Sequence, residues 1–306
     1  MEKDKKQVIL IAGGTGLVGK KLLDILDKNK YDIIVLSRRP QKSVQPGISY
    51  AQWDPDRKHI DQIPAPDHII NLAGEGIADK RWTADRKKQL ISSRVDSALT
   101  IQKYLNDLKI KPLTYISASA VGYYGDRDDE VLGEESGPGS GFLSECCMEW
   151  EKAATQPGVL CQRRIILRIG IVLSQHGGAL PKMMLTSGVR VFNYFGKGEQ
   201  FCPWIHIDDL CRMIIYSLEN VQISGIYNAC AESPVRNKEL IAQIKKVKNT
   251  EGVLVPVPKF LIKISLGEMS SVVLDSCNAS CKKIINTGFK FKYSSISQAL
   301  QDLLIN

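Results

Sequence analysis

The feature that most constrains this chain is a glycine-rich segment near its start, Gly13-Gly-Thr-Gly-Leu-Val-Gly19. An apolar run at 8–12 comes before it, and a stretch with apolar residues at helical spacing, 17–28, comes after it. In a strand–turn–helix of this kind, the glycines allow a tight turn, a close approach of the backbone to a pyrophosphate, and close packing of helix on strand. The helix N-terminus adds unpaired N–H groups and partial positive charge. We therefore expect a dinucleotide site, the alternative being that the glycines only form a turn. The expected contacts are Gly13, Thr15, Gly16, Leu17, Val18 and Gly19.

Strand-like and helix-like stretches alternate through the first two thirds of the chain. Short apolar runs at 32–36, 68–72, 113–118 and 163–167 are typical of buried strands, while 87–109 and 141–155 have helical periodicity. This alternation predicts an α/β fold with a doubly wound parallel sheet, a Rossmann domain, covered by helices on both faces. We expect this domain to span residues 1–175, with strands also contributed from 220–230, and a smaller C-terminal substrate lobe to span 176–306.

The end of the second predicted strand indicates which dinucleotide binds. NAD-binding domains usually place an acidic residue there, which takes the ribose hydroxyls. Here the chain has Ser37, Arg38 and Arg39 instead. A guanidinium matches the geometry of a 2′-phosphate, and a serine hydroxyl adds a donor. The sequence therefore favours NADP(H) over NAD(H), unless Arg38 and Arg39 are only surface charges beside Pro40.

Composition excludes several other classes of protein. The net charge is +8, but the basic residues are scattered and no basic stripe alternates with aromatics, so we expect no nucleic-acid partner. The eight cysteines include no C-x-x-C pair and are expected to be free thiols. The apolar runs are too short to span a bilayer or to act as an export signal, which predicts a cytoplasmic protein without a membrane partner. The segment His206-Ile-Asp-Asp209 is expected to be structural, and no metal site is predicted.

Several motifs accumulate along the chain beside the glycine turn: Asn71-Leu-Ala-Gly74, Ser117–Gly125 and Trp204–Asp209. Together they resemble the extended short-chain dehydrogenase/reductase superfamily. A narrower set consists of Asn71–Glu75, Arg81-Trp82, Ser93–Val95, Trp150-Glu151, Arg168–Leu173, Gly177–Leu180 and Phe201–Asp209. This set resembles the atypical NAD-dependent epimerase/dehydratase-like branch, the epimerase family proteins. The stretches Gly267-Glu-Met269 and Gly288–Phe291 resemble its characteristic C-terminal domain, expected at about 253–304.

The resemblance implies further cofactor contacts. Leu72, Ala73 and Gly74, after the strand at 68–72, would line the adenosine side, where bulk would block the cofactor. Arg94 would direct its cation towards the dinucleotide unless it is a surface charge, and Gln89 would share that site. Val172 would lie beside the nicotinamide end unless it is a core residue.

The catalytic signature of the superfamily is missing. Most members carry Tyr-x-x-x-Lys on a helix, where the tyrosine transfers a proton and the lysine lowers its pKa. Phe142 takes the tyrosine position and Cys146 the lysine position, and neither can perform that chemistry. The serine that orients substrate would be Ser117 or Ser119. A proton could come instead from Tyr123 or Tyr124, or from Glu151 or Lys152, or from substrate or water.

The sequence therefore leaves two functions open. The first is an NADP(H)-binding, epimerase/dehydratase-like oxidoreductase acting on an unknown small molecule. The second is a non-catalytic NADP(H)-binding sensor or regulatory protein. The oligomeric state is open in both.

Overall fold

A computed structural model describes residues 6–43, 45–156 and 161–305. Its centre is one large sheet in the order β14-β8-β6-β5-β1-β2-β3-β4, in which every pairing but β3–β4 is parallel. The order outward from β1 is that of a Rossmann sheet, extended at both edges. The strands are β1 (Gln7–Ala12), β2 (Tyr31–Ser37), β3 (Ile48–Asp54), β4 (His59–Ile60), β5 (His68–Asn71), β6 (Thr114–Ala120), β8 (Arg163–Ile169) and β14 (Gly225–Ala229).

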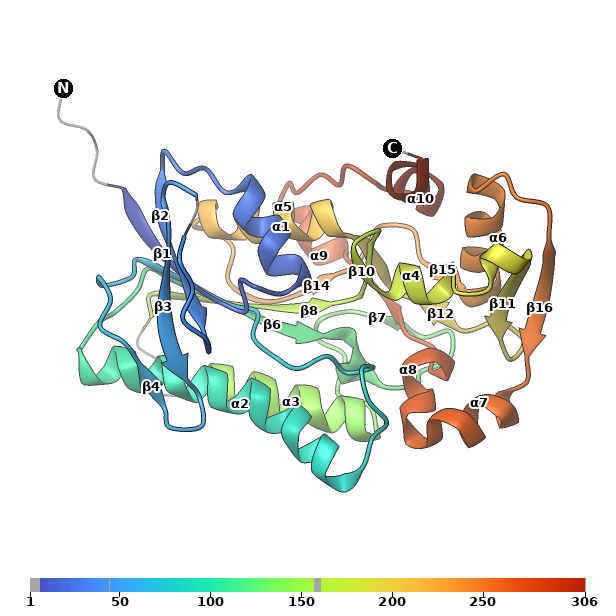
Figure 1. Ribbon diagram of the computed structural model, residues 1–306, viewed down its shortest axis with the longest axis horizontal. Coiled ribbons are helices and arrows are strands. Elements are labelled where there is room, and N and C mark those ends of the chain that lie inside the picture. Colours follow the sequence, from blue (N-terminus) through green and yellow to red (C-terminus); the bar gives the residue numbers. More distant parts are fainter. Residues whose placement is uncertain (1–5, 44, 157–160, 306) are drawn as a thin grey trace.

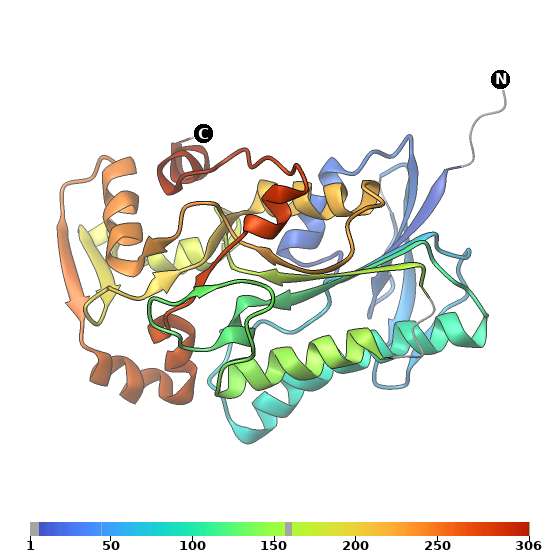
Figure 2. The same cartoon turned by 180° about the vertical axis from the view of Figure 1, so that it is seen from behind.

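Helices cover both faces of this sheet (Figure 1). On one face lie α1 (Leu17–Ile25), α5 (Ile207–Glu219) and α9 (Lys282–Asn286). On the other, α2 (Ala84–Asp107) and α3 (Phe142–Thr155) lie side by side, as both ribbon views show (Figure 2). Because both faces are covered, the central strands are almost continuously buried, as in β5.

A second hydrophobic core lies beyond the carboxyl edge of the sheet. It gathers Leu173, Phe192, Trp204, Ile244 and Leu300, among others. Its strands are β9 (Ile171–Ser174), β10 (Gly177–Gly178), β11 (Val191–Phe195), β12 (Phe201–Cys202), β13 (Trp204–His206), β15 (Val235–Arg236) and β16 (Val253–Val257). The helices of this part are α4 (Ala179–Met183), α6 (Asn237–Val247), α7 (Lys259–Leu266), α8 (Ser271–Leu274) and α10 (Ile296–Ile305). Three 3₁₀ turns, η1 (Val121–Tyr124), η2 (Ser187–Val189) and η3 (Gly267–Ser270), complete the chain, with a short pair of β7 (Val131–Leu132) and β17 (Asn278–Ala279).

The α/β fold with a parallel Rossmann sheet is confirmed. The strand anticipated within 220–230 is β14, which pairs with β8 along the edge of the sheet. Two strands of the main sheet, β3 and β4, were not predicted, nor were the short strands of the second core. The division near residue 175 stays a prediction, since the chain returns to the main sheet after it. No helix within the described ranges is both long and apolar enough to cross a bilayer.

Candidate functional site

The glycine-rich turn joins the carboxyl end of β1 to the start of α1. Gly13 has a φ of +79°, and a Cβ there would stand 2.6 Å from the carbonyl carbon of Leu72. A Cβ on Gly19 would stand 2.4 Å from the carbonyl oxygen of Gly13. Turn and helix therefore touch backbone to backbone, which only glycine permits. In the described chain no side chain caps α1, so its first N–H groups are available to an anion.

The turn lies between two other strand ends. Ala12 pairs with Leu36 of β2 on one side and with Asn71 of β5 on the other. Asn71 is fully buried, and its Oδ1 accepts the N–H of Ala73 at 3.1 Å, which fixes the start of the loop after β5. Ligands bind at this edge of open α/β sheets, in the crevice beside β1 where the strand order reverses.

Ser37 and the two arginines lie at the end of β2. The buried Ser37 hydroxyl donates to the carbonyl oxygen of Arg39 at 2.7 Å and so shapes the turn that follows. Arg38 and Arg39 are exposed, and neither forms an ion pair with any described residue. The hydrogen bond from Arg86, and more weakly the nearby charge of Arg38, hold the pKa of Glu75 below its ordinary value. The charge of Arg38 is therefore close enough to the loop after β5 to act on Glu75.

The residues expected on α2 support that loop. Arg94 donates to the carbonyl oxygens of Leu90 and Glu75 at 2.8 and 2.9 Å, and its guanidinium lies 4.9 Å from the ring centroid of Trp150. Gln89 accepts from the Nη1 of Arg86 at 3.4 Å. Arg94 thus holds the loop in place, while Gln89 bonds Arg86 of the same helix. Direct contact of either side chain with a dinucleotide stays a prediction.

Val172 of β9 is half-buried and packs, as Leu17 does, against the core of the main sheet. A Cβ on Gly178 would stand 3.2 Å from the Val172 carbonyl oxygen and 3.3 Å from the Cδ2 of Leu17. The start of α1 and the end of β9 therefore adjoin. Contact of Val172 with a dinucleotide stays a prediction.

Two of the four proposed catalytic residues, Ser119 and Tyr124, belong to a buried polar network. The Ser119 hydroxyl donates to Glu151 at 2.7 Å, and Glu151 takes two further bonds from Arg168, at 2.8 and 2.9 Å. Arg168 also donates to the hydroxyl of Tyr124, which in turn donates to Asn228 at 2.7 Å. Burial raises the pKa of Tyr124 to about 12. Because its hydroxyl is fully buried and doubly bonded, Tyr124 is poorly suited to proton transfer.

Tyr123 differs from its neighbour. It is half-buried, its ring centroid lies 3.5 Å from the Arg168 guanidinium, and among the described residues nothing bonds to its hydroxyl. Ser117 is fully buried and donates to the adjacent carbonyl of Ala118 at 3.1 Å. Of the four residues suggested for catalysis, Tyr123 alone keeps an unbonded hydroxyl at a partly exposed position.

Phe142 and Cys146 form an apolar cluster with α2. The ring of Phe142 packs edge-on against Trp82 at 4.8 Å, with Leu90 and Cys146 beside it. Burial raises the pKa of the Cys146 thiol, which makes it unreactive. All eight cysteines are free thiols, as expected, and seven are buried. The place of the usual acid–base pair is thus filled by packing.

A titratable group that the sequence did not point to lies nearby. Asp275 directly follows α8. Before it in the chain, Met269 and Val272 pack against the Phe142 cluster. After it, the Cys277 thiol bonds the carbonyl oxygen of Val121, just after β6. Its half-buried carboxylate has neither a hydrogen bond nor an ion pair within the described residues. Burial, and then the charge of Asp126, raise the pKa of Asp275 to about 6. Only the fold brings the two carboxylates together, so no local motif could have revealed them.

The His206-Ile-Asp-Asp209 segment fastens the end of the chain to α5. His206 Nδ1 accepts the Asp208 N–H at 3.0 Å, and Nε2 lies 3.2 Å from the carboxylate of Asp302 in α10. Asp209 accepts the N–H groups of Lys292 and Tyr293, both at 2.8 Å. No cluster of three or more potential metal ligands exists in the part of the chain described.

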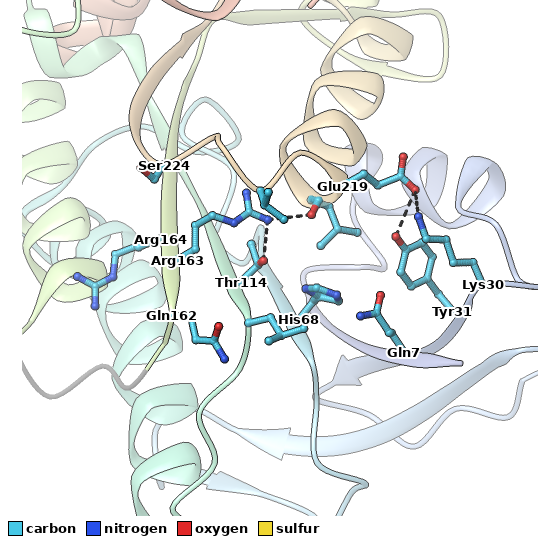
Figure 3. Close-up of a pocket in the computed structure, with 13 residues that line it drawn as sticks. Gln7, Lys30, Tyr31, His68, Thr114, Gln162, Arg163, Arg164, Glu219 and Ser224 are labelled. Atoms are coloured by element: carbon cyan, nitrogen blue, oxygen red, sulfur yellow. Dashed lines mark hydrogen bonds and ion pairs between the residues drawn. The ribbon is translucent and has the colours of Figure 1, made fainter. Parts of the chain in front are cut away.

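A cavity of about 580 Å³ lies at the opposite, amino edge of the sheet (Figure 3). Arg163 there donates to Thr114 and to four carbonyl oxygens at the end of α5, and Lys30 bonds Glu219. These polar groups are already paired with one another. The cavity is therefore separate from the glycine turn and is not the dinucleotide site.

Comparison with known proteins agrees with this assignment. The chain matches the NAD dependent epimerase/dehydratase family over residues 9–230, and a domain of unknown function (DUF1731) over 257–303. It is 36% identical to the epimerase family protein YfhF of Bacillus subtilis, covering 97% of both chains. It is 32% identical to the chloroplastic epimerase family protein SDR39U1 homolog of Arabidopsis thaliana, covering 99% of this chain and 88% of that protein.

Solved structures extend the agreement. The crystal structure of human epimerase family protein SDR39U1 with NADPH superposes with a TM-score of 0.88 at 27% identity, covering 98% of this chain and 100% of that one. A UDP-glucuronic acid 4-epimerase from Bacillus cereus has a TM-score of 0.76 at 15% identity over 97% and 98% of the two chains, a likeness of fold alone. On the family match and on relatives that align along nearly its whole length, the chain belongs to the NAD dependent epimerase/dehydratase family.

Proposed function

We propose that this protein is an NADP(H)-dependent oxidoreductase of the epimerase/dehydratase type that acts on a small molecule. One observation carries the proposal: an uncapped helix N-terminus behind a glycine turn, beside a strand that ends in Ser37 and Arg38 with no acid. The absence of a carboxylate removes the repulsion that a 2′-phosphate would meet there. The NADPH bound to human SDR39U1 supports the same choice.

Different residues would bind different parts of the cofactor. Residues 13–19 would hold the pyrophosphate. Ser37, Arg38 and Arg39, at the end of β2, would bind the 2′-phosphate. Residues 72–74 would line the adenosine, and Val172 would lie beside the nicotinamide end. When bound, the nicotinamide supplies or accepts a hydride. The protein's own contribution is orientation, exclusion of water by the Phe142 cluster, and a source for the proton.

We assign that proton to Asp275. Phe142 cannot supply it, and the Tyr124 hydroxyl is held inside the buried network. Tyr123, which is partly exposed and whose hydroxyl no described residue bonds, is the alternative donor. No described residue bonds the Asp275 carboxyl, and its pKa of about 6 lies close to neutral pH, where a general acid or base works well. In the reducing direction the protonated carboxyl would donate its proton to the carbonyl oxygen of the substrate, and solvent would restore that proton.

Cofactor choice is tested by binding. Arg38→Ala is expected to weaken NADPH binding by about 1–3 kcal/mol, the scale of a lost charge-assisted contact, and to leave NADH binding little changed. Isothermal titration of both nucleotides measures this, with Arg190→Ala, an exposed arginine of the second lobe, as the matched control. Equal affinity of the unmodified protein for NADH and NADPH would sink the assignment.

Turnover separates the enzyme from a sensor. We expect NADPH oxidation with at least one member of a panel of aldehydes, ketones and nucleotide sugars, and Asp275→Asn to slow it by about 10²-fold or more without loss of NADPH binding. Asp129→Asn, an exposed loop acid paired with Arg236, should leave the rate unchanged. Tight NADPH binding without turnover on any substrate would favour the alternative, a non-catalytic NADP(H)-binding regulator. A cytoplasmic location stays a prediction.

A further inference from the structure

The helix α7 is apolar on two opposite sides. Its sequence is Lys-Phe-Leu-Ile-Lys-Ile-Ser-Leu, and successive residues turn by about 100° around a helix axis. Ile262 and Leu266 point one way, and Ile262 is 4% exposed. Phe260, Leu261 and Ile264 point the opposite way and are 61%, 47% and 70% exposed. The fold needs only the first side, so the second is left uncovered.

The exposed residues Phe260, Leu261 and Ile264 form an apolar stripe along α7, and cations lie near it. Lys263 is exposed on the flank next to Phe260, and Lys259, one turn earlier, is exposed with its aliphatic stem against Gly196. Arg81 lies at its C-terminal end, 3.3 Å from where a Cβ on Gly267 would stand. None of the three forms an ion pair with a described residue, and α7 itself carries no acid. The nearest carboxylate along the chain, Glu268, is paired with Lys87.

The shape of the stripe limits what can cover it. Figure 1 shows α7 on the outside, at one end of the molecule. Three partly exposed side chains offer on the order of 300 Å² of apolar surface, since a large side chain buries about 150–250 Å². A stable protein interface buries about 800 Å² on each partner. A bilayer surface needs no complementary groove, and it accepts apolar side chains while lysine stems reach the headgroups.

From these contacts we propose that α7 attaches the protein to the surface of an anionic lipid bilayer. Phe260, Leu261 and Ile264 enter the boundary between headgroups and acyl chains, and Lys259, Lys263 and Arg81 meet the lipid phosphates and carboxylates. The expectation of no membrane partner came from the absence of a spanning segment. Attachment by one exposed helix is a different mode of binding and does not need such a segment.

Vesicle sedimentation of the full chain tests the proposal. We expect the protein to sediment with phosphatidylcholine vesicles containing about 30% phosphatidylserine, and not with phosphatidylcholine alone, with binding weakened by salt. Phe260→Ser with Ile264→Ser should reduce binding at least about 10-fold, and Lys259→Gln with Lys263→Gln should remove the preference for anionic lipid. Leu185→Ser with Val221→Ser, which replaces residues 81% and 73% exposed elsewhere, should bind as the unmodified protein does.

Each contrary result overturns the proposal. The variants are exposed substitutions, and circular dichroism and NADPH titration verify that they fold. Absence of binding to anionic vesicles, or binding that survives Phe260→Ser with Ile264→Ser, removes the role of α7. Sedimentation equilibrium on the same samples tests the alternative that a second copy of the chain covers α7. A dimer that dissociates on Phe260→Ser with Ile264→Ser would show this and overturn the lipid proposal.

Discussion

The surroundings of Asp275 disfavour its ionised carboxylate. Its carboxylate is half-buried beside Asp126 and has no cation. Its pKa of about 6 in the folded protein exceeds the value near 3.9 of an unfolded chain. The folded state therefore binds the proton of Asp275 more tightly, and the contribution of this one group to stability falls as pH rises from about 4 through 6.

Removal of that charge should stabilise the protein. At pH 7.5 we expect Asp275→Asn to raise the free energy of unfolding by about 1–2 kcal/mol, less than the full shift would give because solvent screens a half-buried charge. At pH 4 the gain should disappear, since the aspartate is then protonated in the native state. Urea titrations at both pH values measure the difference, and a gain that is equal at both would contradict the assigned pKa.

The pair of Arg168 and Glu151 is the opposite case, a buried charge with its partner in place. Glu151→Gln would leave the guanidinium buried without a counter-charge, at a cost of about 3–5 kcal/mol of stability. Glu149→Gln on the same helix removes only an exposed contact with Lys152 at 3.9 Å, and should cost less than about 1 kcal/mol. Thermal unfolding of the two variants compares these outcomes directly. Similar melting temperatures would show that the network is not structurally required.

At the scale of the element, the start of α1 depends on contacts that admit no side chain. Gly19→Ala would place a methyl group 2.4 Å from the Gly13 carbonyl oxygen and force the helix away from the turn. We expect a loss of about 1–3 kcal/mol in stability and of NADPH binding together. Gly188→Ala, where nothing lies within 4 Å, should be neutral or slightly stabilising. Intact NADPH binding by Gly19→Ala, measured by titration, would contradict a pyrophosphate site at this turn.

The elements also show what could be predicted from the sequence. The turn, β1 and α1 are adjacent in the chain, so glycine spacing and apolar periodicity sufficed. The strand β3 was missed because its buried residues, Ile48, Ala51 and Trp53, do not alternate regularly. The burial of Tyr124 by Arg168 and Asn228, and the pairing of Asp126 with Asp275, arise from residues far apart in the sequence. The exposure of the outward face of α7 could not be predicted either, because a sequence with apolar residues on two sides of a helix is typical of a buried core helix.

For the whole molecule, stability should fall in acid because His206 joins α5 to α10. Burial lowers the pKa of His206 despite the nearby Asp208, Asp302 and Asp209. The folded state thus favours neutral imidazole, and this contribution is complete above the unfolded pKa near 6.5 and is lost as pH falls through the lower folded pKa. We expect the melting temperature of His206→Asn, which keeps an acceptor for the Asp208 N–H, to decline less between pH 7 and 5 than that of the unmodified protein. A parallel decline would argue against this origin of acid sensitivity.

The path of the chain between its two cores has a consequence for motion. The chain leaves the sheet at β9, returns with α5, leaves again before β15, returns with α9 and ends in α10 within the second core. A rotation of one core about a single hinge would have to bend all of these passages at once. Ligand entry should therefore involve small sliding displacements and rearrangement of loops rather than domain rotation.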